Sequence, residues 1–396
     1  MESALSGIRV LELGQVVAAP FCGAMMADFG AEVIKVEAPG NGDSLRNMGP
    51  ITKGESLWFH VENRNKKCIT LNLKSYEGKE LAKRLVSICD VVLENFKPGT
   101  LEKLGLGWEV IHQVNPRTVL CRISGYGQTG PYSNRYGYDR IGLGVGGLTY
   151  ITGEPSGVPM RPGVALADYL AGIFATAGIM FALRYRDTFS GEGQVVDVSL
   201  YEPVFRIMEF TALDYWLNGR VRERMGTVHP GTVPGGHYRT ADGKWICISC
   251  ANDRVFERLA KAIDREELIN DPRFSSHQKR VENRNEIEAI VAEWVAKHTA
   301  EECRIALQDT VPYGPINSIA DIFSDPHFAA RQDIVEVMDP LLGVLKMQAP
   351  TPKLSSTPGM VRSSGPRPGE HNDEVFGGIL GLDKSRIREL REQGVI

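Results

Sequence analysis

The sequence predicts an α/β protein in which a Rossmann-like large domain is accompanied by a smaller α+β domain. Between residues 7 and 199, short apolar strands alternate with helical segments, which is the pattern of a largely parallel sheet. The chain has 396 residues, more than one hydrophobic core usually supports. Its composition turns polar and rich in Gly, Pro and Arg after residue 217. We therefore expect a large domain over 1–217, a linker over 218–234, a small α+β domain over 235–325, and a return linker over 326–396 whose C-terminal segment packs on the large domain.

The first elements are expected to form a βαβ unit. An apolar strand over residues 7–13 is followed by a turn at Gly14 and a helix that begins near Pro20, and proline suits a first helical turn. Gly30 ends this helix, and EVIKVE at 32–37 is typical of a second strand. Strands over 68–73, 90–94 and 119–124 and a helix over 78–88 continue the alternation. Because helices separate the strands, each crossover should return to the same sheet in parallel.

The later elements are an apolar helix, a further strand and the parts of the small domain. The apolar run over 164–183 predicts a helix, residues 193–199 a strand, and residues 200–217 one long helix. In the small domain, KWICISC is typical of a strand, and helices are expected over 253–263 and 281–297. The proline-rich stretch 339–370 predicts an extended, packed segment, with one or two short helices over 373–396.

Composition excludes several classes of function. A net charge of −4 gives no whole-protein attraction to nucleic acid or to a membrane surface, so neither partner is expected. The start, MESALSGIRVLELG, lacks the features of a signal peptide, which favours the cytoplasm or an organelle matrix. Seven scattered cysteines, an odd number, predict reduced thiols. Cys247 and Cys250 lie three apart on a strand and hence on opposite faces, so no metal site is expected.

Asp168 is the most informative residue. It is the only charged residue between Val164 and Leu183. A carboxylate in such surroundings loses most of its water, which raises its pKa unless a neighbour hydrogen-bonds it. Poorly hydrated carboxylates are good nucleophiles and bases. The alternatives are a capping or core-pairing role near the helix start that Pro162 and Gly163 mark, or a transmembrane span, for which one run carrying an Asp is poor evidence.

Two further features suggest a ligand that carries phosphate. The helix over 20–28 follows a strand and a tight turn, so its N-terminus could hold an anion. Basic residues gather in loops that we expect to be neighbours, and they form either a solvated face or a phosphate site: Lys35, Arg46, Arg64, Lys66, Lys67, Lys74, Lys97 and Lys103. The run Gly142–Gly147 resembles a dinucleotide fingerprint only superficially, because it does not open the first βαβ helix. Close backbone approach explains these glycines better.

Several segments together resemble the class III CoA-transferases, the family that includes formyl-CoA and carnitine CoA-transferases. The resemblance runs from Gly7 to the C-terminus, and its main segments are GIRVLELGQVVAAPFCGAMMADFGAEVIKVEAP, NRNKKCITLNLKSYEGKEL, ENFKPGTLEKLGLGW, ISGYGQTGPY, GYD, ALADYLAG, GQVVDVSLYE and YGPINS. It implies an interlocked homodimer and transfer of CoA between carboxylic acids, with acyl-CoA as a substrate and no tightly bound cofactor. The family's catalytic aspartate falls on Asp168, which its apolar setting indicates independently.

The resemblance also implies roles for other residues. Asp168 would attack the acyl-CoA thioester to give a mixed anhydride, and the CoA thiolate would then form an aspartyl-CoA thioester. Water must be excluded because it would hydrolyse the anhydride. Gly235 and Gly236 are the candidate loop for oxyanion stabilisation, since glycine permits close approach of the main chain. The implied CoA contacts are Val16, Ala18, Leu71, Lys74, Asn95, Phe96 and Lys103.

Departures from the formyl-CoA enzymes bear on the substrate. Val17, Ala38 and Tyr136 stand where those enzymes have glutamine, arginine and lysine, so formate and oxalate are not expected. The segments RERMGTVHPGTVPGGHYRTADG and VPYGPINS look closest to members that use succinyl-CoA and C4 or C5 dicarboxylates such as glutarate, citramalate or itaconate. The candidates for pairing the far carboxylate are Arg161, Arg222, Arg224 and His237.

Three other functions fit the sequence less well. A 2-methylacyl-CoA racemase of the same fold pairs its Asp with a His in Gly-His-Asp, where this chain has Gly137-Tyr138-Asp139. A phenol is a far weaker base than an imidazole at neutral pH, so Tyr138 is expected to line the acyl pocket or to hydrogen-bond the anhydride. An NAD-dependent oxidoreductase would need a Gly-x-Gly-x-x-Gly in the first turn, and this chain has none there. A binding or scaffold protein leaves Asp168 unexplained.

Overall fold

The computed structural model describes residues 2–396, and the chain divides into two compact units. Unit 1 contains the chain up to Thr149 together with Arg161–Arg220 and His327–Ile396, and unit 2 contains Tyr150–Met160 and Val221–Pro326. Residues 150–160 thus group with unit 2, although the sequence placed them in the large domain. The four-part domain division stays a prediction.

A six-stranded sheet forms the centre of unit 1, and all of its strand pairs are parallel. Its spatial order is β5 (Lys67–Thr70), β2 (Glu32–Glu37), β1 (Arg9–Glu12), β6 (Val91–Glu94), β7 (Val119–Ser124) and β8 (Val195–Ser199). The strand order reverses between β1 and β6, so the loops after these two strands diverge and leave a crevice at the carboxyl edge of the sheet. The predicted α/β fold with a parallel sheet is confirmed.

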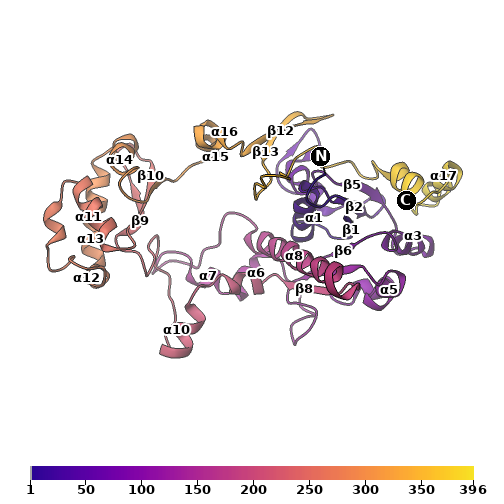
Figure 1. Cartoon of the computed structure of the whole chain (residues 1–396), viewed down its shortest axis with the longest axis horizontal. Coiled ribbons are helices and arrows are strands. Elements are labelled where there is room, and N and C mark those ends of the chain that lie inside the picture. Colours follow the sequence, from indigo (N-terminus) through magenta and orange to yellow (C-terminus); the bar gives the residue numbers. More distant parts are fainter. Residues whose placement is uncertain (1) are drawn as a thin grey trace. The chain divides into compact units, whose positions relative to one another are not determined.

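Helices cover both faces of this sheet, because its strands are apolar on both sides. On one face, α1 (Ala18–Asp28) and α8 (Leu166–Tyr185) share a buried cluster with the strands. On the other face lie α3 (Tyr76–Val86), α5 (Trp108–Val114) and, from the end of the chain, α17 (Lys384–Glu392). Figure 1 shows α17 beside α3, where Arg386 Nη2 lies 3.1 Å from Glu77 Oε1.

The contact between α1 and α8 fixes where Asp168 lies. A Cβ added to Gly172 would lie 2.9 Å from the Ala18 carbonyl oxygen, so the two backbones nearly touch. One turn earlier on α8, Asp168 is thereby held against the loop that precedes α1. Residues 166–190 have the length and hydropathy of a membrane-spanning helix, but core helices pass the same test, and here Ala171, Ala175 and Ile179 are fully buried in the cluster with α1.

Unit 2 is built on a three-stranded antiparallel sheet. The sheet has the order β11 (Tyr313–Pro315), β10 (Trp245–Ser249) and β9 (Gly235–Arg239). Its apolar side packs against α11 (Asp253–Ala262), α13 (Arg284–Ala296) and α14 (Ala300–Leu307). Cys250 joins this core, whereas Cys247 lies on the other side and contacts the Gly314 carbonyl, which confirms that the pair faces opposite ways.

Three predicted elements differ in detail. The helix expected over 200–217 is two helices, α9 (Glu202–Arg206) and α10 (Thr211–Asn218), interrupted at Glu209, whose φ of 52° is left-handed. The helix expected over 281–297 begins anew at α13 after α12 (His277–Glu282). The stretch expected to be extended contains β13 (Gly343–Gln348), which forms a hairpin with β12 (Ile334–Asp339). Interrupted helices keep an apolar period, so periodicity alone does not reveal the break.

The remaining short elements complete unit 1. Those wholly in unit 1 are β3 (Ile51–Thr52), β4 (Glu55–Ser56), α2 (Leu57–Glu62), α4 (Thr100–Lys103), α6 (Asp139–Val145) and a π-helical turn over Asp373–Ile379. Two helices cross the boundary between the units, α7 (Leu148–Ile151) and α16 (Pro326–Ala330), and α15 (Ile319–Ser324) belongs to unit 2. Gly142 in α6 and Gly146 directly after it permit close approach, as expected, whereas a Cβ at Gly144 would meet no atom within 4 Å. A Cβ at Gly146 would lie 2.6 Å from Val204 side-chain atoms.

Candidate active site

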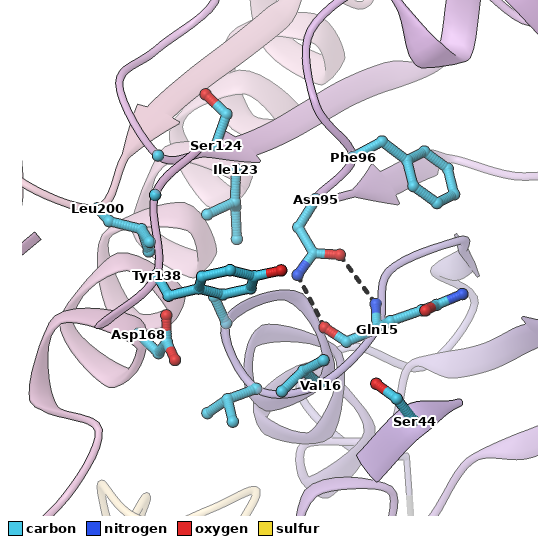
Figure 2. A pocket seen from close by; sticks show the side chains of 14 residues that line it. Gln15, Val16, Ser44, Asn95, Phe96, Ile123, Ser124, Tyr138, Asp168 and Leu200 are labelled. Atoms are coloured by element: carbon cyan, nitrogen blue, oxygen red, sulfur yellow. Dashed lines mark hydrogen bonds between the residues drawn. The ribbon is translucent and has the colours of Figure 1, made fainter. Parts of the chain in front are cut away.

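A cavity of about 240 Å³ lies at the carboxyl edge of the sheet, at the reversal between β1 and β6. The loops after β1, β6 and β7 line it, together with the starts of α6 and α8 (Figure 2). The lining residues are Gln15, Val16, Val17, Ala18, Ser44, Asn95, Phe96, Ile123, Ser124, Gly125, Gly137, Tyr138, Asp168 and Leu200. Ligands of open α/β sheets bind at such reversals.

The loop after β1 is locked by a reciprocal amide pair. The Gln15 backbone N–H donates to Asn95 Oδ1 at 2.8 Å, and Asn95 Nδ2 donates to the Gln15 carbonyl at 2.8 Å, as the dashed lines in Figure 2 show. The next residue, Val16, has a φ of 65°. This left-handed conformation is unfavourable for a β-branched side chain and persists only where the surroundings enforce it. Here the Asp43 carboxylate accepts the Val16 N–H at 3.0 Å.

A buried network of ion pairs holds this loop in place. Lys35 Nζ lies 2.8 Å from Asp43 Oδ2 and 3.2 Å from Glu12 Oε1, and it donates to the Gly14 carbonyl at 2.9 Å. Burial alone would lower the pKa of Lys35, but the charges of Glu12 and Asp43 outweigh it and hold that pKa above its usual value. The ammonium therefore stays charged and keeps Asp43 oriented toward Val16.

Asp168 lies in the first turn of α8, and its side chain is partly buried in the cavity wall. Among residues 2–396 no group donates a hydrogen bond to its carboxylate. Instead Asp139 supports the helix, because its Oδ1 accepts the Ala167 N–H at 2.9 Å. Burial, followed by the negative charges of Asp139 and Glu62, raises the pKa of Asp168 from 3.8 to about 7. The capping alternative is thus wrong, because Asp139 caps the helix and Asp168 makes no capping hydrogen bond.

Tyr138 lies beside Asp168, and the main chain of its own loop fixes its position. It precedes α6, and its side chain is 71% exposed. In the view of Figure 2, its ring lies between Asp168 and Asn95. The preceding Gly137 meets Gly125 closely, since a Cβ on either would lie 2.7 Å from the other's Cα. Glycine at both positions therefore lets the loop after β7 approach the start of α6 and place Tyr138 at the cavity.

A second cavity, of about 590 Å³, shares one wall with the first. The two have Val16, Val17, Tyr138 and Asp168 in common. The other lining residues of the second cavity are Met48, Trp58, Asp139, Arg140, Arg161, Gly163, Val164, Ala165 and Tyr169. The Asp168 carboxylate is therefore accessible from two sides, one facing the reversal of the sheet and one facing the residues before α8.

The structure brings together most, but not all, of the residues expected at the site. Val16, Ala18, Asn95, Phe96, Tyr138 and Asp168 line the first cavity. Three expected CoA contacts do not line it: Leu71 is a core residue at 2% exposure, and Lys74 and Lys103 are exposed near the same edge of the sheet. Their contact with CoA stays a prediction.

Gly235 and Gly236 were expected to form a loop, and this expectation is wrong. They are the first two residues of β9 and pair with Ser249 and Ile248 of β10. The Gly235 N–H already donates to Glu288 Oε1 at 2.8 Å, so this donor is occupied. Oxyanion stabilisation by these glycines stays a prediction without structural support.

The basic residues separate into structural and unneutralised sets. Five are ion-paired: Lys35 and Lys66 with Glu12, Arg46 with Glu37, Arg64 with Asp28, and Lys67 with Glu32. Within residues 2–396, Lys74, Lys97 and Lys103 have no acidic partner, and Lys97 Nζ lies 4.4 Å from the centroid of the Tyr136 ring. These three lysines are therefore the cations available to a phosphate bound at this edge of the sheet.

Sequence reasoning missed Gln15, Ser44, Ser124 and the role of Asp139. A usable signal existed for Ser124, because it ends β7 at the carboxyl edge, where sites of parallel sheets lie. No local signal pointed to Ser44, which a turn beyond β2 brings in. In the described part of the chain, no group of three or more His, Cys, Asp or Glu is arranged to hold a metal ion. Burial raises the pKa of Cys22 to about 12, so this nearby thiol is a poor nucleophile.

Comparisons with known proteins show which family this chain is similar to. A family model described as CoA-transferase family III matches residues 5–372. The chain is 48% identical to a succinyl-CoA--D-citramalate CoA-transferase of Chloroflexus aurantiacus, over 99% of this chain and 98% of that protein. It is 37% identical to the succinyl-CoA:glutarate CoA-transferase of Mus musculus, over 99% and 90%. A crystal structure of a CAIB/BAIF family protein from Brucella suis matches with a TM-score of 0.85 and 34% identity, covering 96% of this chain and 100% of that one.

Proposed function

Because this chain belongs to CoA-transferase family III, we propose that it moves CoA from succinyl-CoA to a C4 or C5 dicarboxylate through covalent intermediates on Asp168. The observation that carries the proposal is a carboxylate without a hydrogen-bond donor among residues 2–396, placed on the wall of a cavity at the sheet reversal. Relatives named for D-citramalate, L-malate and glutarate support the substrate class.

The proposed chemistry is a sequence of acyl exchanges without water. The Asp168 carboxylate attacks the thioester carbonyl of succinyl-CoA, the C–S bond breaks, and a succinyl-aspartyl anhydride and CoA thiolate form. The thiolate attacks the aspartyl carbonyl and expels succinate, which leaves an aspartyl-CoA thioester. The acceptor carboxylate attacks this thioester, releasing thiolate and giving a new anhydride. The thiolate then attacks the acceptor's acyl carbon, and Asp168 leaves as a free carboxylate.

The surroundings of Asp168 suit this sequence. A carboxylate with no donors is poorly stabilised and hence reactive, and its pKa of about 7 leaves it largely ionised in mildly alkaline solution. The first cavity offers Phe96 and the amide pair of Asn95 at the sheet reversal, with Lys97 and Lys103 beyond, which fits the pantetheine and phosphates of CoA. Relatives named as transferases, and Tyr138 in place of histidine, leave no support for a racemase.

We also propose that the protein acts as an interlocked homodimer. Large apolar side chains on α8, α9 and α10 are exposed in the single chain, among them Phe181, Phe205 and Trp216 at 74%, 56% and 82%, and such surfaces usually bind another protein. Light scattering should give twice the mass of the chain. Two differently tagged dimers should not exchange subunits unless they are unfolded, and free exchange would argue against interlocking.

The function is tested by transfer and by trapping. The protein is incubated with succinyl-CoA and glutarate, citramalate or malate, and new CoA thioesters are followed by mass spectrometry. Asp168→Ala should abolish transfer, whereas Asp187→Ala, a surface carboxylate beyond the end of the same helix, should leave it intact. Hydroxylamine or borohydride should modify Asp168 in the peptide spanning 164–184 after incubation with succinyl-CoA. Residual turnover in Asp168→Ala, or an adduct on Cys22 instead, would overturn the mechanism.

A further inference from the structure

We propose that the acid occupies the second cavity, with its far carboxylate bound by Arg140. This inference rests on the proposed function and deepens it, because it assigns which residue distinguishes a dicarboxylate from a monocarboxylate. CoA then lies in the first cavity, and Asp168 reacts at the wall that the two cavities share.

The walls of the second cavity fit an acid with an apolar middle. Val16, Val17, Met48, Trp58 and Val164 contribute aliphatic and aromatic surface. The indole N–H of Trp58 is already engaged with Glu62 Oε1 at 3.1 Å and with the Tyr169 hydroxyl at 3.2 Å, so it presents mainly its ring. A short methylene chain can lie against this surface without leaving a polar group unpaired.

The charges that line this cavity do not all cancel locally. Arg161 Nη1 lies 3.1 Å from Asp139 Oδ2 and also donates to the Val164 carbonyl at 3.2 Å. Asp139 and Arg161 thus neutralise each other and are held in place. The side chain of Arg140 makes no hydrogen bond or ion pair with any residue in 2–396, and the carboxylate of Asp168 makes none either. One guanidinium and one reactive carboxylate are left for the ligand.

The unpaired guanidinium gives the cavity a charge that changes with the reaction. While Asp168 is a free carboxylate, the lining charges sum to zero. Once Asp168 is an uncharged aspartyl thioester, Arg140 leaves a net positive charge. A dianionic acceptor is then attracted to the enzyme at the stage when it is needed, and guanidinium is well matched to carboxylate because it can donate two parallel hydrogen bonds. Arg140 therefore acts as a specificity-determining residue.

The assignment is tested by comparing two acids of equal length, glutarate and pentanoate, which differ only in the far carboxylate. Arg140→Gln should raise the KM for glutarate by about 10- to 100-fold, the loss expected for one charge-assisted contact, and leave kcat within a few-fold. The KM for pentanoate should be unchanged. If pentanoate is not turned over, its Ki as an inhibitor of transfer to glutarate should be unchanged instead. Arg140→Lys should retain part of the preference. Arg135→Gln is the matched control, because Arg135 stacks on Tyr132 and does not line the cavity.

Two outcomes separate this inference from the function on which it rests. If wild-type protein transfers CoA but Arg140→Gln weakens glutarate and pentanoate equally, or neither, the assignment of Arg140 is overturned while the function stands. If wild-type protein transfers CoA to no acid, the function fails. Calorimetric titration of wild type and Arg140→Gln with glutarate and pentanoate then still decides whether Arg140 selects for the second carboxylate.

Discussion

Replacing Asp168 by asparagine should stabilise the protein, and the gain should depend on pH. Burial raises the pKa of Asp168 from 3.8 to about 7 in the folded state, and one pKa unit corresponds to about 1.4 kcal/mol. The ionised carboxylate therefore costs the folded state about 4 kcal/mol at most above pH 7. Because part of the side chain opens to the cavity, we expect about 2–4 kcal/mol after allowing for solvent screening.

The sign follows from the direction of the shift. The pKa of this carboxyl is higher in the folded than in the unfolded protein, so its contribution to stability is fully present below about pH 4, where it is protonated in both states. This contribution is lost as the pH rises toward 7. Asparagine carries no charge at any pH. The stability difference between Asp168→Asn and wild type should thus be small at pH 4, grow through pH 5 and 6, and level off above pH 7.

Thermal unfolding monitored by circular dichroism at several pH values checks this expectation. For a cooperative unit of a few hundred residues, about 2–4 kcal/mol corresponds to a rise in Tm of roughly 3–7 °C at pH 8. Asp187→Asn is the control of opposite sign, because the Arg186 side chain holds the pKa of Asp187 below its usual value. A Tm difference for Asp168→Asn that is constant with pH, or a lower Tm at pH 8, would refute the reasoning.

Three further predictions concern the site. Activity, measured as kcat/KM, should rise with pH and level off above about pH 7, since only ionised Asp168 attacks. Asp139→Asn removes a neighbouring negative charge and should shift the midpoint of this rise to lower pH. An unchanged midpoint would contradict this expectation. Tyr138→Phe should raise the activation free energy of transfer by about 0.5–3 kcal/mol and so slow the reaction. A 2-methylacyl-CoA incubated with the wild-type protein in D2O should gain no deuterium at its α-carbon, and rapid uptake would indicate a racemase. Asn95→Ala should raise the KM for acyl-CoA and cost about 1–3 kcal/mol of stability, because the loop at Val16 loses both amide hydrogen bonds; an unchanged KM would show that this loop does not hold CoA.

Local pattern determined the framework of the large unit. The strands over 32–37 and 119–124 have the predicted bounds, because buried parallel strands are short, rich in β-branched and other apolar residues, and bounded by glycine or polar residues. The same reasoning singled out Asp168, since a single charge in an apolar helix is visible without any tertiary information. Family resemblance then supplied the chemistry for a carboxylate in that setting, which composition and periodicity could not do.

Tertiary structure decided which residues meet Asp168. Asp139 was known from the sequence as part of Gly-Tyr-Asp, but only the fold shows that it caps α8 and so frees Asp168 from that role. Likewise, eight basic residues looked equivalent in the sequence, and only the fold separates Lys35, buried and ion-paired, from Lys97, which has no acidic partner among residues 2–396. Arg140, which lines the second cavity, was not among those eight. Partners of this kind lie far apart along the chain or depend on the rotation of one side chain. Local periodicity and composition therefore carry no record of them, whereas packing of α8 on α1 and reversal of the sheet between β1 and β6 fix them.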